Sequence, residues 1–196
     1  MKYLILTVLI LIAAIVISQI FITRSTSKTE TAQYEILADF DGFEIRKYPE
    51  LLVASTPLTS DSYSANSRAG FQKIASYIFG GNSSNLKISM TSPVQMEISD
   101  HSSMSFYMPS EMSREQLPIP NRNDVNIKIE PMKIVASIEF SGWASDSVLE
   151  EKFKELKNKL IENKIDFEDN YSYLGYNPPY QLVNRKNEVI IKLINY

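Results

Sequence analysis

An internal repeat with a constant offset of 82 residues places the strongest restriction on how this chain can fold. The identities fall in matching predicted elements: Pro49, Val53, Ala54, Ser55 and Phe71 reappear as Pro131, Val135, Ala136, Ser137 and Phe153. Their placement indicates a duplicated unit. The units, at about residues 43–108 and 125–195, each read as strand–strand–helix–strand–strand, and the proline-containing segment 109–124 links them.

Each unit has one apolar helix face to bury, so the two units are expected to pack together and join their sheets. The sequence therefore predicts an α+β fold, in which duplicated ββαββ units form a distorted eight-stranded antiparallel barrel flanked by two helices. A pseudo-twofold cleft where two such units meet is a common position for a ligand.

The first predicted helix, about residues 62–79, is followed by an irregular strand. The apolar side chains of the helix repeat with the period of one α-helical face, as Phe71, Ile74, Ala75 and Ile78. Glycine and asparagine at 80–82 end the helix. Pro93 lies within the next strand, about 87–99, and removes a ladder donor, so this strand is expected to be bulged or to lie at an edge. Together the two elements could form a wall for a flat apolar ligand.

The N-terminal arm is apolar for long enough to cross a bilayer. No charge occurs between Lys2 and Arg24, and 20 residues of helix span about 30 Å, the thickness of the hydrocarbon layer. We expect residues 1–23 to be a retained transmembrane signal-anchor rather than a cleaved signal peptide, because the exit is a mediocre cleavage site. Residues 24–33 are expected to be a flexible tether, and the domain to lie outside the cytoplasmic membrane.

Composition excludes several kinds of site. The chain has no cysteine, which excludes disulfides and thiolate chemistry, and its single histidine, His101, lies in a predicted turn. A net charge of −3 gives no general attraction to nucleic acid, so no nucleic-acid partner is expected. No carboxylate pair has a spacing that suggests acid–base catalysis, and we expect a protein without catalytic activity. Four methionines on neighbouring strands of the first unit could pack in the core or ligate haem iron, namely Met90, Met96, Met104 and Met108.

Seven short motifs in order resemble the SOUL haem-binding protein family, over about residues 34–196. They are Phe43-Glu44-Ile45-Arg46-Lys47-Tyr48, Gly70-Phe71, Tyr77-Ile78-Phe79-Gly80, Met90-Thr91-Ser92-Pro93-Val94, Phe106-Tyr107-Met108-Pro109, Tyr176-Asn177-Pro178-Pro179 and Arg185-Lys186-Asn187-Glu188-Val189. The resemblance implies the same duplicated barrel. It also implies non-covalent binding of haem or another tetrapyrrole against an apolar surface, with basic contacts to the propionates and no shared axial ligand.

We expect the ligand to lie between the first helix and a proline-containing loop near 176–180, where two prolines and two tyrosines could form the lip of a pocket. Arg68 matches a basic position of some family members, whereas Ser76 and Gln181 stand where some relatives carry lysine. Glu188 is expected to form a structural ion pair with Arg46 or Arg185. The expected cofactor-binding residues are Arg68, Phe71, Gln72, Lys73, Ala75, Met90, Tyr176, Pro178 and Pro179.

Two other functions remain open from the sequence. One is a small-molecule effector-binding or hydrolase module on the same fold, which a buried carboxylate with a raised pKa at Glu97 or Glu188 would favour. The other is a structural envelope protein that binds a partner, which a large exposed apolar patch would favour.

Overall fold

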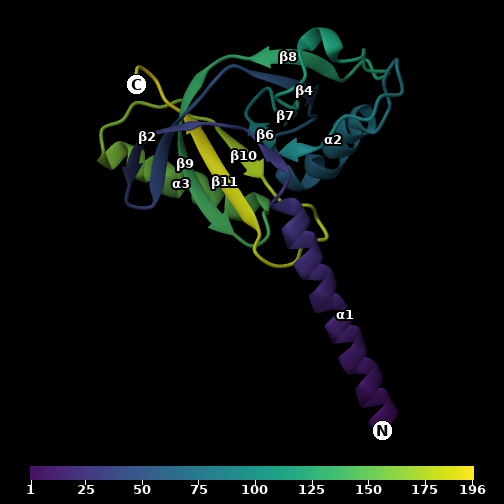
Figure 1. Cartoon of the computed structure of the whole chain (residues 1–196). Helices are drawn as coiled ribbons and strands as arrows, with labels where there is room; N and C mark the ends of the chain where they lie inside the picture. The colour runs from purple at the N-terminus through teal and green to yellow at the C-terminus, as the bar shows by residue number, and fades with distance from the viewer.

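One curled antiparallel sheet of nine strands, in the order β2-β3-β9-β11-β10-β6-β7-β4-β8, carries the fold. The computed structural model describes all residues, Met1–Tyr196, and Figure 1 shows the body and the long helix α1 that leaves it. The helices are α1 (Lys2–Thr26), α2 (Tyr63–Ile78), α3 (Asp146–Glu162) and the 3-10 turn η1 (Arg114–Gln116). The strands are β1 (Glu30–Thr31), β2 (Glu35–Phe40), β3 (Phe43–Tyr48), β4 (Leu51–Pro57), β5 (Thr91–Ser92), β6 (Val94–Ile98), β7 (Ser103–Tyr107), β8 (Asn126–Glu130), β9 (Lys133–Ser141), β10 (Tyr171–Gly175) and β11 (Lys186–Lys192).

The predicted α+β class and the helix-flanked, curled sheet are confirmed, with two differences in detail. The sheet has nine strands rather than eight, because β2 adds to β3 at one edge. Its two edge strands, β2 and β8, do not pair with each other, so the sheet is a half-barrel and does not close.

The irregular strand after α2 is also confirmed. Pro93 separates β5 from β6, and the Ser92–Pro93 peptide bond is cis. The short strand β5 leaves the main sheet and pairs in parallel with β1, with Glu30 opposite Thr91. Part of the expected tether, 24–33, is therefore ordered against the body.

The order strand–strand–helix–strand–strand occurs twice, as β3-β4-α2-β6-β7 and β8-β9-α3-β10-β11. The first strand of each segment pairs with the second strand of the other, β3 with β9 and β8 with β4, and the segments also meet at β6 and β10. Phe71 and Phe153, which are related by the 82-residue offset, each pack on another aromatic ring, but the partners, Phe106 in β7 and Tyr171 in β10, are not at equivalent positions. Descent from one duplicated unit stays a prediction.

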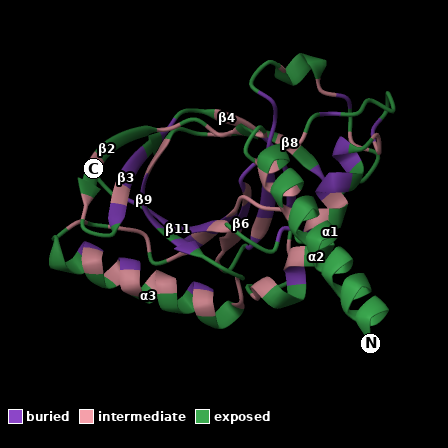
Figure 2. Cartoon of the chain, turned by 60° about the horizontal axis from the view of Figure 1, so that its bottom comes forward, coloured by how far each residue is buried: buried purple, intermediate pink, exposed green.

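The main hydrophobic core lies between the sheet and the two helices α2 and α3, which cover the outer face of the curl (Figure 2). Strand residues alternate between the two faces, so every second residue enters this core. In β9 the core-facing residues are Ala136, Ile138 and Phe140. The helices contribute Ile74 and Ile78 from α2, and Leu149, Leu156 and Leu160 from α3.

No residue of helix α1 is buried. It is long and apolar enough to cross a membrane, and a signal sequence near an N-terminus would pass the same test. Twenty-five helical residues correspond to about 38 Å.

Candidate functional site

The start of α2 is fixed by hydrogen bonds from two directions. Ser62 caps the helix, because its hydroxyl accepts from the backbone N–H of Ala65. Asp146, the first residue of α3, accepts from the N–H groups of Tyr63 (2.6 Å) and Ser64 (3.2 Å). The side chain of Ser64, followed by the backbone N–H groups of Ser64 and Tyr63, lowers the pKa of Asp146. A carboxylate at a helix N-terminus is favourable, so α3 holds the beginning of α2 in place.

The outer face of α2 carries one free cation and one paired cation. Arg68 is exposed and makes no hydrogen bond or ion pair with the rest of the chain. Lys73 pairs with Asp124 at 3.0 Å, and Arg122 pairs with the same carboxylate at 2.9 Å. Hydrogen bonds from Arg122 and Lys73 hold the pKa of Asp124 well below its usual range. Arg68 is therefore the cation on this helix that is available to an anionic ligand.

The predicted apolar residues of the first helix lie at the edge of the main core. Phe71 is half-buried, and its ring meets that of Phe106 with 5.2 Å between centroids. Ala75 is buried, and Met90 is half-buried against the same core. Gln72 is exposed beside Arg68 on α2. The side chains of Phe71 and Met90 thus keep part of their apolar surface available at the rim of the core.

The structure does not bring Tyr176 together with Phe71. The Tyr176 hydroxyl donates to Glu188 Oε2 at 2.8 Å, on the concave face of the sheet, whereas Phe71 lies on the helix side. Burial, followed by the charge of Glu188, raises the pKa of Tyr176. The alternation of residues along β10 could have indicated that Tyr176 lies on the concave face. Tyr171 and Tyr173 belong to the main core, and the even-numbered positions face the other way.

Pro178 and Pro179 belong to the loop between β10 and β11, and Arg185 braces this loop from within. Its guanidinium donates to the carbonyl oxygens of Pro178 (2.9 Å) and Gln181 (2.8 Å). It also lies over the ring of Trp143 at 4.2 Å, which is within the range of a cation–π contact. Arg185 is therefore occupied by the protein itself, as is Lys73.

The concave face holds a buried ion pair that the sequence predicts. Arg46 Nη1 lies 2.9 Å from Glu188 Oε2, and Lys186 Nζ lies 3.0 Å from the other oxygen of Glu188. Glu44 accepts from Arg46 Nε at 2.7 Å, and the ring of Tyr34 covers the guanidinium at 4.3 Å. Burial alone would lower the pKa of Arg46, but the charges and hydrogen bonds of Glu188 and Glu44 outweigh it and raise the pKa.

The concave face also holds a cluster of polar side chains that the sequence did not indicate. The Tyr107 hydroxyl donates to Gln95 Oε1 at 2.6 Å, and Lys133 donates to the same oxygen at 3.0 Å while pairing with Glu130. Burial raises the pKa of Tyr107 and lowers the pKa of Lys133. Polar residues at every second position of neighbouring strands could have indicated this cluster. Two buried hydroxyls of this face, those of Tyr48 and Ser137, have no hydrogen-bond partner in the protein.

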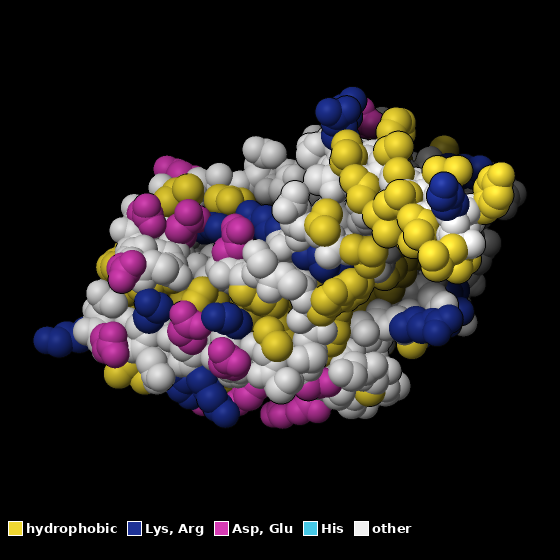
Figure 3. Space-filling view, turned by 90° about the horizontal axis from the view of Figure 1, so that it is seen from below, with side chains coloured by type: hydrophobic (Ala, Val, Ile, Leu, Met, Phe, Trp, Pro, Cys, Tyr) yellow, Lys and Arg dark blue, Asp and Glu magenta, His cyan; other side chains and the backbone are white.

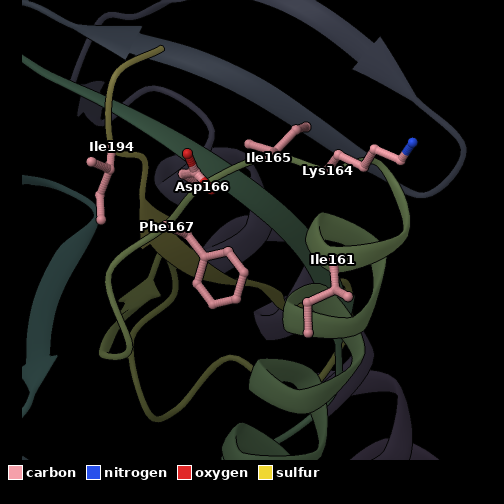
Figure 4. A pocket seen from close by; sticks show the side chains of 6 residues that line it. All are labelled: Ile161, Lys164, Ile165, Asp166, Phe167 and Ile194. Atoms are coloured by element: carbon pink, nitrogen blue, oxygen red, sulfur yellow. The ribbon is translucent and has the colours of Figure 1, made fainter.

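Two surface pockets lie outside the predicted site. The larger, about 550 Å³, is open and mainly apolar, and it lies at the end of α3 beside the C-terminal tail (Figure 4). Its walls are Ile161, Lys164, Ile165, Asp166, Phe167 and Ile194. The smaller, about 220 Å³, is polar and lies between residues 58–61 and the turn that carries His101. His101 is exposed, and no cluster of three or more His, Cys, Asp and Glu side chains is placed to hold a metal ion.

Comparison with known proteins gives the family. A family model described as "SOUL heme-binding protein" matches residues 29–192. Heme-binding protein 2 of Homo sapiens is 33% identical over 156 residues, covering 75% of this chain and 76% of that protein. Heme-binding protein 1 of Xenopus laevis is 24% identical over 155 residues, covering 75% and 81%. The crystal structure of the EcmrR C-terminal domain has a TM-score of 0.60 at 10% identity, covers 83% of this chain and 99% of that one, and shows a shared fold. The chain belongs to the SOUL haem-binding protein family.

Proposed function

We propose that this protein binds haem or another flat tetrapyrrole non-covalently, on a domain that α1 tethers to a membrane, and that it has no catalytic activity of its own. The observation that carries the ligand is the family match over residues 29–192, together with relatives that are named for haem binding. The apolar, unburied helix α1 supports the tether. We place the domain outside the cytoplasmic membrane because the short basic start of the chain, with Lys2 before the apolar stretch, is similar to an export signal.

We place the ligand against the outer face of α2, where the residues fit the chemistry of the group. Arg68 has a free guanidinium that can form a charge-assisted pair with a propionate. Phe71 and Met90 offer part of their apolar surface to a porphyrin plane. Ala75 is small enough for close approach, and Gln72 lies one turn from Arg68 on the same helix face. Lys73 lies at the other border of the exposed face of α2, about 140° around the helix from Arg68, and would reach a ligand only at its edge.

The loop side of the proposed site consists of Pro178 and Pro179, which rigidify the chain. Tyr176 anchors this loop through its bond to Glu188, so we propose that it positions the loop rather than contacts the ring. Bound haem would supply an iron centre, while the side chains of this protein bind and orient the ring.

Haemin titration of the full chain in detergent micelles tests this proposal through the shift of the Soret band. Arg68→Glu replaces an attraction to propionate with a repulsion, and a charged hydrogen bond of about 1.5–3 kcal/mol corresponds to roughly 10- to 100-fold in affinity. Arg114→Glu is the matched control, because Arg114 is exposed on η1 and forms no ion pair. Equal affinity of the two variants would remove the α2 site, and no Soret shift in any of them would remove haem as the ligand.

The second candidate function, an effector-binding module, has one observation in its favour. Tyr48 and Ser137 point unpartnered hydroxyls into the buried concave face, where a polar ligand could satisfy them. The charge of Glu188 is balanced there by Arg46 and Lys186, so Glu188 is not a free carboxylate for a hydrolase. Glu97, the other carboxylate considered for that role, forms no ion pair and accepts only from the Ser103 hydroxyl at 3.4 Å. Tyr48→Phe separates the two functions, since it would weaken a ligand of the concave face and leave haemin binding on α2 unchanged.

A further inference from the structure

The loop between β10 and β11 is bonded directly to helix α1. The side-chain amide of Gln19 donates to the carbonyl oxygen of Tyr180 at 3.2 Å and accepts from the backbone N–H of Leu182 at 2.8 Å. One amide thus satisfies a donor and an acceptor of the loop backbone. This contact sets the level along α1 at which the loop lies.

Contact between α1 and the body begins at Gln19. The half-covered residues of α1 are Gln19, Ile22, Thr23 and Thr26, a spacing that places them on one stripe of the helix. Every residue from Lys2 to Ser18 is exposed. The body therefore packs only on the last two turns of the helix, and the rest projects freely (Figure 1).

The apolar stretch of α1 is longer than its free part. From Tyr3 to Ile22 the helix rises about 30 Å, which equals the hydrocarbon thickness of a typical bilayer, whereas from Tyr3 to Ser18 it rises only about 24 Å. If the apolar stretch fills the hydrocarbon layer, the remaining ~6 Å runs alongside the body. The loop bonded at Gln19 then lies at the outer edge of the membrane.

The side chains of the loop suit that position. Tyr180, Leu182 and Val183 are 63%, 54% and 50% exposed. Trp143 is 55% exposed and stacks on Arg185 at the root of the loop. Residues 176–185 contain no Asp or Glu, and the guanidinium of Arg185 is turned inward onto carbonyl oxygens. Figure 3 shows hydrophobic side chains that continue from α1 onto the adjoining face of the body.

We propose that the loop Tyr176–Arg185 is a second membrane contact, and that Tyr180, Leu182 and Val183 enter the lipid interface beside α1. This inference rests on the proposed tethering by α1. Tyrosine and tryptophan favour the level of the lipid head groups, and leucine and valine favour the acyl chains just below. Two contacts fix the tilt of the body on the membrane, which a single helix with a flexible linker would leave free.

The chain has no cysteine, so a cysteine introduced by mutation is the single site that a thiol-reactive label can modify. Leu182→Cys, labelled with an environment-sensitive fluorophore, reports on the loop in the full chain, reconstituted into phosphatidylcholine–phosphatidylglycerol vesicles. Val183→Cys is a second reporter in case the first variant folds poorly. Glu115→Cys is the control, because Glu115 is exposed on η1, at the far end of the body from α1 (Figure 1).

We expect the labels at 182 and 183 to shift their emission to shorter wavelength and to lose intensity when brominated lipids are included, with no such change at 115. Extraction with alkaline carbonate in the same vesicles shows whether α1 is inserted. A chain that resists extraction while the labels at 182 and 183 behave like that at 115 overturns the loop contact and leaves the tether intact. A chain that carbonate removes overturns both.

Discussion

Arg46 and Glu188 form an ion pair across strand β9, with 2.9 Å between Nη1 and Oε2 and side chains that are 5% and 0% exposed. The pair joins β3, near the start of the domain, to β11, near its end, over the concave face of the sheet. It is surrounded by the rings of Tyr34 and Tyr176, which limit access of water. An unpaired charge at this position would have no solvent to stabilise it.

Removing one member of this pair should strongly destabilise the protein. Glu188→Ala leaves Arg46 buried with only Glu44, and we expect a loss of about 3–5 kcal/mol in the free energy of unfolding. The double variant Arg46→Met, Glu188→Met should lose far less, because Lys186 keeps Glu139 as a partner and no charge is left buried. Urea unfolding of the detergent-solubilised chain, followed by the fluorescence of Trp143, measures both.

The exposed pair Lys154–Glu150 on α3 is the control for that comparison. Glu150→Ala should change stability by less than about 1 kcal/mol, since exposed ion pairs contribute little. A similar small loss for Glu188→Ala would contradict the structural role of the buried pair.

Alkaline pH should destabilise the protein through its buried tyrosines. Burial, then the charges of Glu150 and Asp146, raises the pKa of Tyr171 from 10.0 to about 12. Its neutral form is therefore favoured in the folded state, so the stabilisation is complete below pH 10 and is lost as the pH rises from 10 to about 12. For this one hydroxyl the loss is on the order of 3 kcal/mol.

Tyr171→Phe isolates this contribution. The variant should lose less stability than the parent chain between pH 9.5 and 11.5, by urea unfolding at each pH, because the ring remains and the ionisable hydroxyl is absent. Identical pH dependence of the two proteins would show that ionisation of Tyr171 is not linked to folding.

The end of α2 depends on one buried amide. Asn82 donates to the carbonyl oxygens of Tyr77 (3.0 Å) and Leu86 (2.8 Å), and its own oxygen accepts from the N–H groups of Ser84 and Leu86. Asn82→Ala leaves the N–H groups of Ser84 and Leu86 and the carbonyl oxygen of Leu86 without partners, whereas the carbonyl oxygen of Tyr77 still accepts from the N–H of Gly80. We expect a cost of about 1–3 kcal/mol by thermal or urea unfolding.

Asn123→Ala removes a matched but exposed amide that makes no hydrogen bond in the structure, and it should leave stability within about 0.5 kcal/mol of the parent. Equal effects of the two asparagine substitutions would refute the role assigned to Asn82.

Haem binding on α2 should not need the single histidine. His101→Ala is expected to leave the haemin-induced Soret shift unchanged, because His101 is exposed in the turn between β6 and β7 and does not lie on α2. Absorbance titration in parallel with the parent chain checks this. Loss of the shift would instead place the iron at that turn, beside the polar pocket formed with residues 58–61.

The elements that sequence patterns predict well are those with one clear period. The spacing of Ile74 and Ile78 on α2 predicts their burial, and Pro93 predicts the break between β5 and β6. The sequence does not indicate strand β2, because its apolar residues Ile36, Leu37 and Ala38 are consecutive and do not alternate with polar ones. Alternation also assigns a residue to a face but does not name the neighbouring strand, and the pairing of β3 with β9 therefore needed the structure.

The candidate site is predicted less completely for the same reason. The basic residues Arg68 and Lys73 share a helix, and the sequence cannot tell that Asp124 neutralises one and leaves the other free. The motifs led us to expect Tyr176 and Phe71 at one site, but in the structure they lie on opposite faces of the sheet. The residue types predict the ion pair of Arg46 with Glu188. They do not predict its burial, which results from the curl of the sheet.

The crossed pairing of the two segments has a consequence for biosynthesis. When β3 leaves the ribosome, its neighbour β9 has not been made, and β4 likewise waits for β8. Helix α1, by contrast, precedes every strand and could enter a bilayer at once. The nascent protein would then hold unsatisfied strand edges close to the lipid until translation is nearly finished, which is the stage at which such chains are most prone to aggregate.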